Sequence, residues 1–173
     1  MLDGRSVRLR PVRDDDVGML ARIRSTPEVH RHWRGGADMV TAVRQDLAEP
    51  GSTPYVVELD GRVVGWIQWQ AEEEPDYRHA EIDLYLDPEV HGRGVGTDAV
   101  STMVASLIRD HGHHRIVIDP AVDNPAAIRA YEKVGFRRVG VMRQSERGPD
   151  GVWHDSLLME LLADEWVDPH GDD

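Results

Sequence analysis

The feature that most constrains what this chain can fold into is a glycine-rich stretch between a predicted strand and a predicted helix. Its residues are His91, Gly92, Arg93, Gly94, Val95, Gly96 and Thr97. An alternating apolar run over residues 80–86 precedes it, and an amphipathic run over residues 97–109 follows it. Glycine permits positive φ and close approach of a ligand, and the free N–H groups of a helix start favour an anion. The stretch predicts a phosphate-binding loop, although a structural turn is equally compatible with it alone.

Two well-known phosphate-binding patterns do not match this loop. Its glycine spacing is not that of the Rossmann fingerprint, and predicted helices and a hairpin precede it. A Walker loop would end in Gly-Lys-Ser or Gly-Lys-Thr, and this stretch does not. A second motif is therefore needed to identify the ligand.

Strand and helix signals alternate along the chain. Before the loop we predict an edge strand over residues 5–10, a helix capped within Asp14-Asp15-Asp16, a short helix over 27–33 stopped by Gly35-Gly36, a helix capped by Asp38, and a hairpin over 53–70 with an Asp60-Gly61 turn. After it we predict a strand over 115–119, a helix capped by Asn124, and a closing hairpin over 136–162. With 173 residues the chain is expected to form one domain, 1–173, whose acidic tail, 164–173, frays.

Composition excludes several classes of function. The formal net charge of −12 disfavours nucleic acid and anionic membranes and favours a cationic ligand, although solubility alone also explains such a charge. The absence of cysteine excludes disulfides, thiolate metal sites and a cysteine-linked intermediate. His111, His113 and His114 lack ligand spacing, so no metal site is expected. Without a membrane-spanning run or a signal peptide, the expected location is the cytoplasm.

A second motif follows the predicted strand at 115–119. Its recognisable positions are Asn124, Ala127, Tyr131, Gly135 and Phe136. Together with the glycine loop it resembles the GNAT superfamily of acyl-CoA-dependent N-acyltransferases, whose patterns are Gln/Arg-x-x-Gly-x-Gly/Ala and Asn-x-x-Ala-x-x-x-Tyr-x-x-x-Gly-Phe. The loop departs from the first pattern because His91 takes the Gln/Arg place.

Within that superfamily the chain is most similar to the aminoglycoside 6'-N-acetyltransferases. The matching pieces are residues 29–36, Thr53-Pro54-Tyr55, Ile82-Asp83 and residues 118–136. Siderophore-lysine acyltransferases look similar in the same places. The resemblance implies an α/β fold of mixed α+β type, with a central, mostly antiparallel, twisted sheet of about seven strands that is splayed at the acyl-CoA site and flanked by helices.

The resemblance also implies where acetyl-CoA, the expected co-substrate, binds. The N–H groups of residues 93–97 would hold the pyrophosphate, and backbone near Tyr85 and Leu86 would pair with the pantetheine arm. The expected cofactor-binding residues are Tyr85, Leu86, His91, Gly92, Arg93, Gly94, Val95, Gly96, Thr97, Asn124, Ala127 and Tyr131. Arg93 adds a charge if it faces the phosphates, and is otherwise solvated.

Acetyl transfer to an ammonium requires a base for its proton and an acid for the departing thiolate. Asp83 matches the family position proposed for the base, and Tyr131 matches the general acid. The resemblance further implies that Asp119 contacts substrate amines and that Trp33 packs on a substrate ring. Each residue also has a purely structural alternative: hydrogen-bond acceptor for Asp83, packing for Tyr131, cap of the helix turn at Asn124 for Asp119, and core anchor for Trp33.

The resulting hypothesis is an acetyl-CoA-dependent N-acetyltransferase that acts on a primary amine of a small polycationic substrate, in particular the 6'-amine of an aminoglycoside. Acylation of a siderophore hydroxylysine or a protein N-terminus, and a non-catalytic acyl-CoA sensor, stay open as alternatives. Neither nucleic acid nor membrane is an expected partner, and the chain is expected to be a monomer or a homodimer. The sequence leaves the acceptor, the acyl chain preference and a role in antibiotic resistance undecided.

Overall fold

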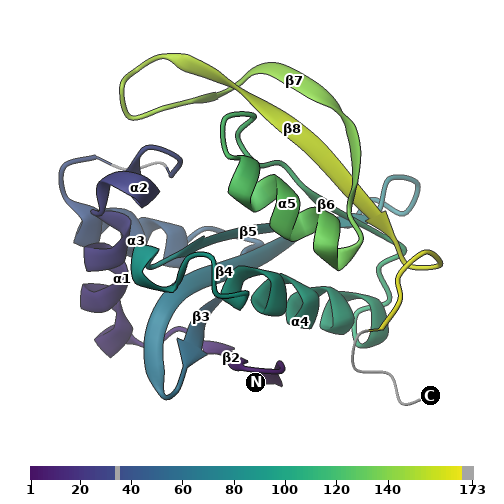
Figure 1. The fold of residues 1–173 in the computed structure, drawn as a ribbon, viewed down its shortest axis with the longest axis horizontal. Helices are drawn as coiled ribbons and strands as arrows, with labels where there is room; N and C mark the ends of the chain where they lie inside the picture. Colours follow the sequence, from purple (N-terminus) through teal and green to yellow (C-terminus); the bar gives the residue numbers. More distant parts are fainter. Residues whose placement is uncertain (34–35, 169–173) are drawn as a thin grey trace.

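A twisted sheet of eight strands runs through the molecule, with helices on both faces (Figure 1). The computed structural model describes residues 1–33 and 36–168. The strands are β1 (Leu2–Asp3), β2 (Val7–Pro11), β3 (Thr53–Leu59), β4 (Arg62–Glu72), β5 (His79–Leu86), β6 (Arg115–Ile118), β7 (Arg137–Arg147) and β8 (Trp153–Leu162). Their order is β1-β2-β3-β4-β5-β6-β8-β7. Among the described strands only β5 and β6 pair in parallel, which confirms the expected mixed α/β fold with a mostly antiparallel sheet.

The strand that exceeds the expected seven is β1. It pairs with β2 through Leu2 and Asp3 only. Because β1 covers β2 on the outside, the prediction that residues 5–10 form an edge strand is wrong. A strand of two residues is too short to carry an alternating pattern from which it could have been predicted.

The helices divide between the two faces of the sheet. They are α1 (Val17–Arg24), α2 (Pro27–His30), α3 (Met39–Leu47), α4 (Val95–Arg109) and α5 (Pro125–Val134), with short 3-10 turns at Asp14–Asp16 and Pro88–Val90. One apolar cluster lies between the sheet and α4 with α5, and a second lies under α1, α2 and α3. The predicted stop of the second helix at Gly35-Gly36 falls partly outside the described residues, and α2 itself ends at His30.

Local sequence signals explain several element ends. Asp60 and Gly61 both adopt positive φ, 51° and 74°, as the two-residue turn of the β3–β4 hairpin requires. The Asp38 carboxylate accepts the backbone N–H of Val40 at 3.1 Å and caps α3. The Asn124 side chain accepts the Ala127 N–H at 3.2 Å and caps α5. The predicted hairpin and both predicted caps are confirmed.

The sheet separates between β5 and β6. The two strands pair only through Ala80 with Ile116 and Glu81 with Val117. Beyond Glu81, β5 continues to Leu86 beside β4 alone. The expected splay between the two strands is therefore present.

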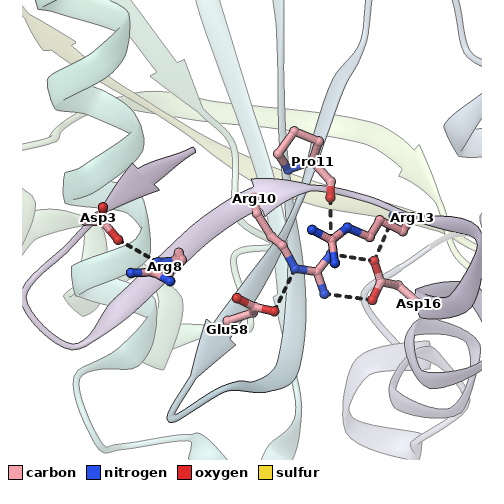
Figure 2. Close-up of polar contacts among 7 residues, drawn as sticks. All are labelled: Asp3, Arg8, Arg10, Pro11, Arg13, Asp16 and Glu58. Atoms are coloured by element: carbon pink, nitrogen blue, oxygen red, sulfur yellow. Dashed lines mark hydrogen bonds and ion pairs between the residues drawn. The ribbon is translucent and has the colours of Figure 1, made fainter.

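A buried ionic cluster joins β2 to β3 and to the 3-10 turn before α1 (Figure 2). The Arg10 guanidinium donates to both carboxylate oxygens of Asp16, at 2.7 and 2.9 Å, and to Glu58 at 2.6 Å. The Arg13 backbone N–H also donates to Asp16 at 2.7 Å. The hydrogen bond from Arg10 is the main cause that lowers the pKa of Asp16, against the opposing effect of burial. The Asp16 carboxylate therefore pairs with Arg10 and also caps the 3-10 turn before α1 by accepting the Arg13 N–H, so part of the capping role expected from the sequence is present.

The tail that was expected to fray divides into two parts. Residues 169–173 lie outside the described residues. In residues 164–168, Trp166 packs partly buried against the core, and the Arg109 guanidinium lies 5.3 Å from the centre of its ring. This part of the tail is held against the end of α4. In the described part of the chain, no helix combines the length and apolar character needed to cross a bilayer.

Candidate functional site

Two cavities lie beside the gap between β5 and β6. The first, of about 360 Å³, is bounded by the end of β5, the glycine loop, the start of α4 and one side of α5, and we call it the loop cavity. The second, of about 500 Å³, lies between β4, β5, β6 and the β7–β8 hairpin, and we call it the acidic cavity. Six residues line both of them: His32, Trp33, Leu84, Asn124, Ala127 and Tyr131. The two cavities therefore meet at these side chains.

The glycine loop exposes backbone to the loop cavity. Gly92 and Gly94 have positive φ, 73° and 83°, and no heavy atom lies within 4 Å of where a Cβ would stand at either position. Gly94 is the N-cap of α4, so the free N–H groups of its first turn start here. Open backbone at the start of a helix of 15 residues is suited to an anionic group. These features fit a donor that carries phosphates.

His91 connects the loop to the strand that precedes it. Its Nε2 lies 3.1 Å from the Leu86 carbonyl oxygen. Because a carbonyl only accepts, the ring nitrogen donates in this bond. The His91 side chain thus fixes the end of β5 to the loop and does not present its Nε2–H to a ligand.

Carboxylates dominate the acidic cavity. In the part of the chain that the structure describes, the carboxylates that line it are Asp46, Glu49, Glu81, Asp83, Asp119 and Glu146, and the arginines are Arg24 and Arg147. They come from α3 and the turn after it, from β5, from the end of β6, and from β7. Such a wall attracts cations and repels anions.

Tyr131 lies at the junction of the two cavities and is 7% exposed. Burial raises the pKa of its phenol well above the ordinary value, and the charges of Asp83 and Asp119 raise it further. The phenol is therefore protonated at neutral pH. It is able to donate a hydrogen bond or a proton at the point where the cavities meet.

The indole of Trp33 forms another part of this junction. It makes an edge contact with the Tyr85 ring at 4.9 Å, and the Arg24 guanidinium lies 5.8 Å from its centre. Arg24 is itself 2% exposed and donates to Asp46 at 2.5 Å. The parallel stacking of Tyr85 on Trp66, at 6.4 Å, anchors the group to β4. Trp33 thus packs against the core and lines both cavities, so its two predicted roles are compatible.

The segment that carries Trp33 also contacts the far side of the site. Arg31 pairs with Asp123 at 3.1 Å, and His32 Nδ1 lies 3.7 Å from the same carboxylate. Asp123 belongs to the turn before α5. Burial is the main cause that lowers the pKa of His32. Through these side-chain contacts, the segment after α2 is held against the turn that precedes α5.

The structure brings most of the predicted site residues to these cavities. The loop cavity is lined by Trp33, Tyr85, Leu86, His91, Gly92, Gly94, Val95, Gly96, Thr97, Asn124, Ala127 and Tyr131. The acidic cavity receives Asp83 and Asp119 together with Trp33 and Tyr131. Arg93 is exposed and lines neither of these two cavities. The Asn124 side chain itself caps α5, so the cap that the sequence offered as an alternative for Asp119 is supplied by another residue.

Sequence reasoning missed several residues of the site. In the acidic cavity these are Asp46, Glu49, Gln68, Gln70, Glu146 and Trp153, and in the loop cavity Arg129 and Lys133. Only the spacing of Arg129 and Lys133, four apart on a predicted helix that also carries Tyr131, could have signalled a shared face. Within the described ranges, His, Asp and Glu form no group of three or more that could hold a metal ion.

Comparison with known proteins identifies the class. The family model described as an acetyltransferase (GNAT) domain matches residues 6–137, and the chain belongs to this family of acetyltransferases. It is 30% identical over 164 residues to aminoglycoside N(6')-acetyltransferase type 1 of Klebsiella pneumoniae, covering 84% of this chain and 79% of that protein. It is 23% identical over 180 residues to spermidine N(1)-acetyltransferase of Escherichia coli K12, covering 98% and 93%.

A solved structure shows the same arrangement of elements. The structure of AAC(6')-Ib in complex with paromomycin and acetyl-CoA superposes on this chain with a TM-score of 0.78 at 30% identity. The match covers 97% of this chain and 99% of that one. The likeness therefore extends over nearly the whole chain, including the β7–β8 hairpin that the family model does not reach.

Proposed function

We propose that this acetyltransferase uses acetyl-CoA to acetylate a primary amine of a small polycationic substrate, the 6'-amine of an aminoglycoside. The observation that carries the proposal is the junction of two cavities of opposite character at Tyr131. One cavity offers open backbone amides to an anionic donor, and the other offers six carboxylates to a cationic acceptor.

The donor side follows from the backbone. When bound, acetyl-CoA supplies the acetyl thioester. The N–H groups of residues 93–97 donate to its pyrophosphate, because they stand at the start of α4. The end of β5, near Tyr85 and Leu86, pairs with the pantetheine arm, since β6 pairs with β5 only as far as Glu81. Asn124 and Ala127 form the opposite wall.

Asp83 is the proposed general base. An ammonium group has no lone pair, so its proton must leave before the nitrogen attacks. Asp83 lines the acidic cavity, and its charge acts on the phenol of Tyr131 at the junction. Its carboxylate lies 3.4 Å from the Gln68 side-chain nitrogen, which is oriented to donate to it. Asp83 accepts the proton directly or through one water.

Tyr131 is the proposed general acid, which donates its proton to the departing sulfur. Its pKa, raised mainly by burial and further by Asp83 and Asp119, keeps the phenol protonated before the reaction. A cationic acceptor bound among the carboxylates opposes the part of that shift that comes from charge. Substrate binding thus lowers the pKa of the Tyr131 phenol toward that of a thiol, which makes proton transfer to the thiolate easier.

Acceptor recognition combines charge with aromatic surface. Asp119 pairs with a further amine of the substrate, and Trp33 stacks on a sugar ring. Trp153, at the start of β8, offers a second indole at the cavity wall. Rings that carry several amines use both kinds of contact, whereas a linear polyamine uses mainly the carboxylates.

The test is a thiol-release assay with acetyl-CoA and a panel of amines: kanamycin, tobramycin, spermidine, a hydroxylated lysine and an N-terminal peptide. The expected result is the highest kcat/KM with an aminoglycoside, and mass spectrometry is expected to place the acetyl group on the 6'-nitrogen. Preference for spermidine would keep the polycationic class and overturn the aminoglycoside. A preference for a longer acyl-CoA with hydroxylysine, or for the peptide, would support those alternatives, and CoA binding without any turnover would indicate a sensor.

A further inference from the structure

Charge is sorted between the two cavities. Among the residues that the structure describes, the acidic cavity has six carboxylates against two arginines, whereas the loop cavity has Arg129 and Lys133 against a single carboxylate, Glu28. In a chain with a net charge of −12, a cavity wall with more cations than carboxylates runs against the average surface. It indicates a ligand with negative charge on that side.

The two cations belong to one face of α5. Ala126, Arg129, Ala130 and Lys133 all line the loop cavity and none of them lines the acidic cavity. Their spacing of three and four residues places them in one stripe along the helix. The two alanines have small side chains that leave room in the cavity, whereas the long side chains of Arg129 and Lys133 are exposed. The stripe runs along most of α5, from Ala126 near its start to Lys133 near its end.

Within residues 1–33 and 36–168, neither Arg129 nor Lys133 has a protein partner for its charge. Among the described residues, no carboxylate forms an ion pair with either side chain. The carboxylate of the same helix, Glu132, instead accepts from Arg138 on β7 at 2.7 Å. Both cations are therefore able to bind a ligand.

The loop itself supplies no cation to the cavity. His91 donates its Nε2–H inward to Leu86, and Arg93 does not line the cavity. The loop amides account for one anionic group, the pyrophosphate of the proposed donor. CoA carries a second, the 3'-phosphate on its ribose, which needs a separate partner.

Resting on the proposed use of acetyl-CoA, we propose that Arg129 and Lys133 form the subsite for the 3'-phosphate of CoA. Arg129 donates two N–H groups to the phosphate oxygens, and the ammonium of Lys133 adds a third contact from the next turn of the helix. At position 91, where the family pattern has Gln or Arg, this chain has a histidine whose Nε2–H is used by the Leu86 carbonyl, so the subsite on α5 supplies the cations that the loop does not.

The experiment compares two ligands that differ only in this group. Isothermal titration calorimetry measures Kd for CoA and for 3'-dephospho-CoA with the wild-type chain, Arg129→Gln, Lys133→Gln and the double variant. Arg44→Gln, on the outside of α3, controls for the change in net charge. Because exposed charge pairs are individually weak, each single variant is expected to raise the Kd for CoA about threefold, and the double variant is expected to raise it about tenfold. Kd for 3'-dephospho-CoA is expected to stay within about twofold of wild type.

The outcomes are separable. An equal loss of affinity for CoA and for 3'-dephospho-CoA would overturn the inference, because the two cations would then act on the pyrophosphate or through the overall electrostatic field of the protein. Unchanged CoA affinity in the double variant would overturn it as well, even if the melting temperature fell through the loss of a cation near the end of α5. Failure of the wild-type chain to bind CoA at all would instead overturn the proposed function.

Discussion

Gly65 on β4 lies directly against the backbone of Tyr85 on β5. A Cβ at position 65 would overlap the Tyr85 carbonyl oxygen and would stand 2.6 Å from a methyl group of Leu86. The end of β5 is thus pressed against β4 on one side, while on the other side it has already parted from β6. The position of the strand at the loop cavity depends on the absence of this one side chain.

Gly65→Ala is therefore expected to displace the end of β5. Overpacking of this kind costs about 1–3 kcal/mol of the free energy of unfolding, and the shift also weakens CoA binding. Thermal unfolding and calorimetric titration with CoA measure the two effects. Gly18→Ala is the matched control, since Gly18 is exposed on α1 and nothing lies within 4 Å of its Cβ position. That control is expected to be stabilising by up to about 1 kcal/mol.

Asp83→Asn and Tyr131→Phe test the proposed proton transfers. Each is expected to lower kcat by about a hundredfold or more, because positioned acids and bases contribute on that scale. CoA affinity is expected to stay near wild type, since both replacements keep size and shape. Asp76→Asn and Tyr77→Phe, on the exposed loop between β4 and β5, are the controls. Loss of CoA affinity equal to the loss of kcat would assign both residues a structural role instead.

Asp16→Asn tests the buried ionic cluster of Figure 2. The substitution leaves the Arg10 guanidinium, whose side chain is 11% exposed, without its two-oxygen partner. A cost of about 3–5 kcal/mol in the free energy of unfolding is expected, and urea denaturation measures it. Asp3→Asn removes the exposed pair with Arg8 in the same view and is expected to leave the free energy of unfolding nearly unchanged.

The same cluster predicts a pH dependence of stability. Arg10 lowers the pKa of Asp16 in the folded state, so the folded chain binds this proton less readily than the unfolded chain. The stabilisation is complete above the unfolded value of about 3.9 and is lost as the pH falls through the lower, folded value. Denaturation curves between pH 6 and pH 3 should therefore show a steeper decline for wild type than for Asp16→Asn. Parallel curves would contradict the assignment.

Arg24→Lys tests the support of Trp33. A lysine keeps the charge beside Asp46 but has no planar group to lie over the indole. A rise of about threefold to tenfold in KM for the proposed acceptor is expected, with a smaller change in kcat, because the substitution loosens one wall of the acidic cavity. Arg22→Lys, on an exposed position of the same helix, is the control. Unchanged KM would show that Trp33 needs no such support.

Signals that act within a few residues were predicted correctly from the sequence. The Asp60-Gly61 turn, the Asp38 and Asn124 caps and the glycine loop all follow from backbone preferences of the residues themselves. The loop and the Asn124 segment could be assigned to one donor site because two motifs in order resembled one family. Their meeting in a single cavity is a consequence of β5 and β6 being neighbours, which no local pattern encodes.

The carboxylates of the acidic cavity show why the remaining site residues could not be predicted from the sequence. Asp46 and Glu49 come from the region of α3, and Glu146 from β7, a hundred residues later, on an edge strand beyond β8. Each looks like an ordinary surface carboxylate in the sequence, because acidic residues are common throughout this chain. Only the strand order, in which β6 lies between β5 and β8, brings them around one cavity. His91 is a similar case, since its bond to Leu86 depends on the local path of the loop.

The six carboxylates also have a consequence for the end of a catalytic cycle. In the proposed reaction an ammonium group becomes a neutral amide, so the product carries one positive charge fewer than the substrate. The same wall that draws the substrate in therefore attracts the product less. The same electrostatic attraction that selects the acceptor thus favours release of the acetylated product. Inhibition by accumulated product should therefore be weaker than the affinity for the substrate alone would suggest.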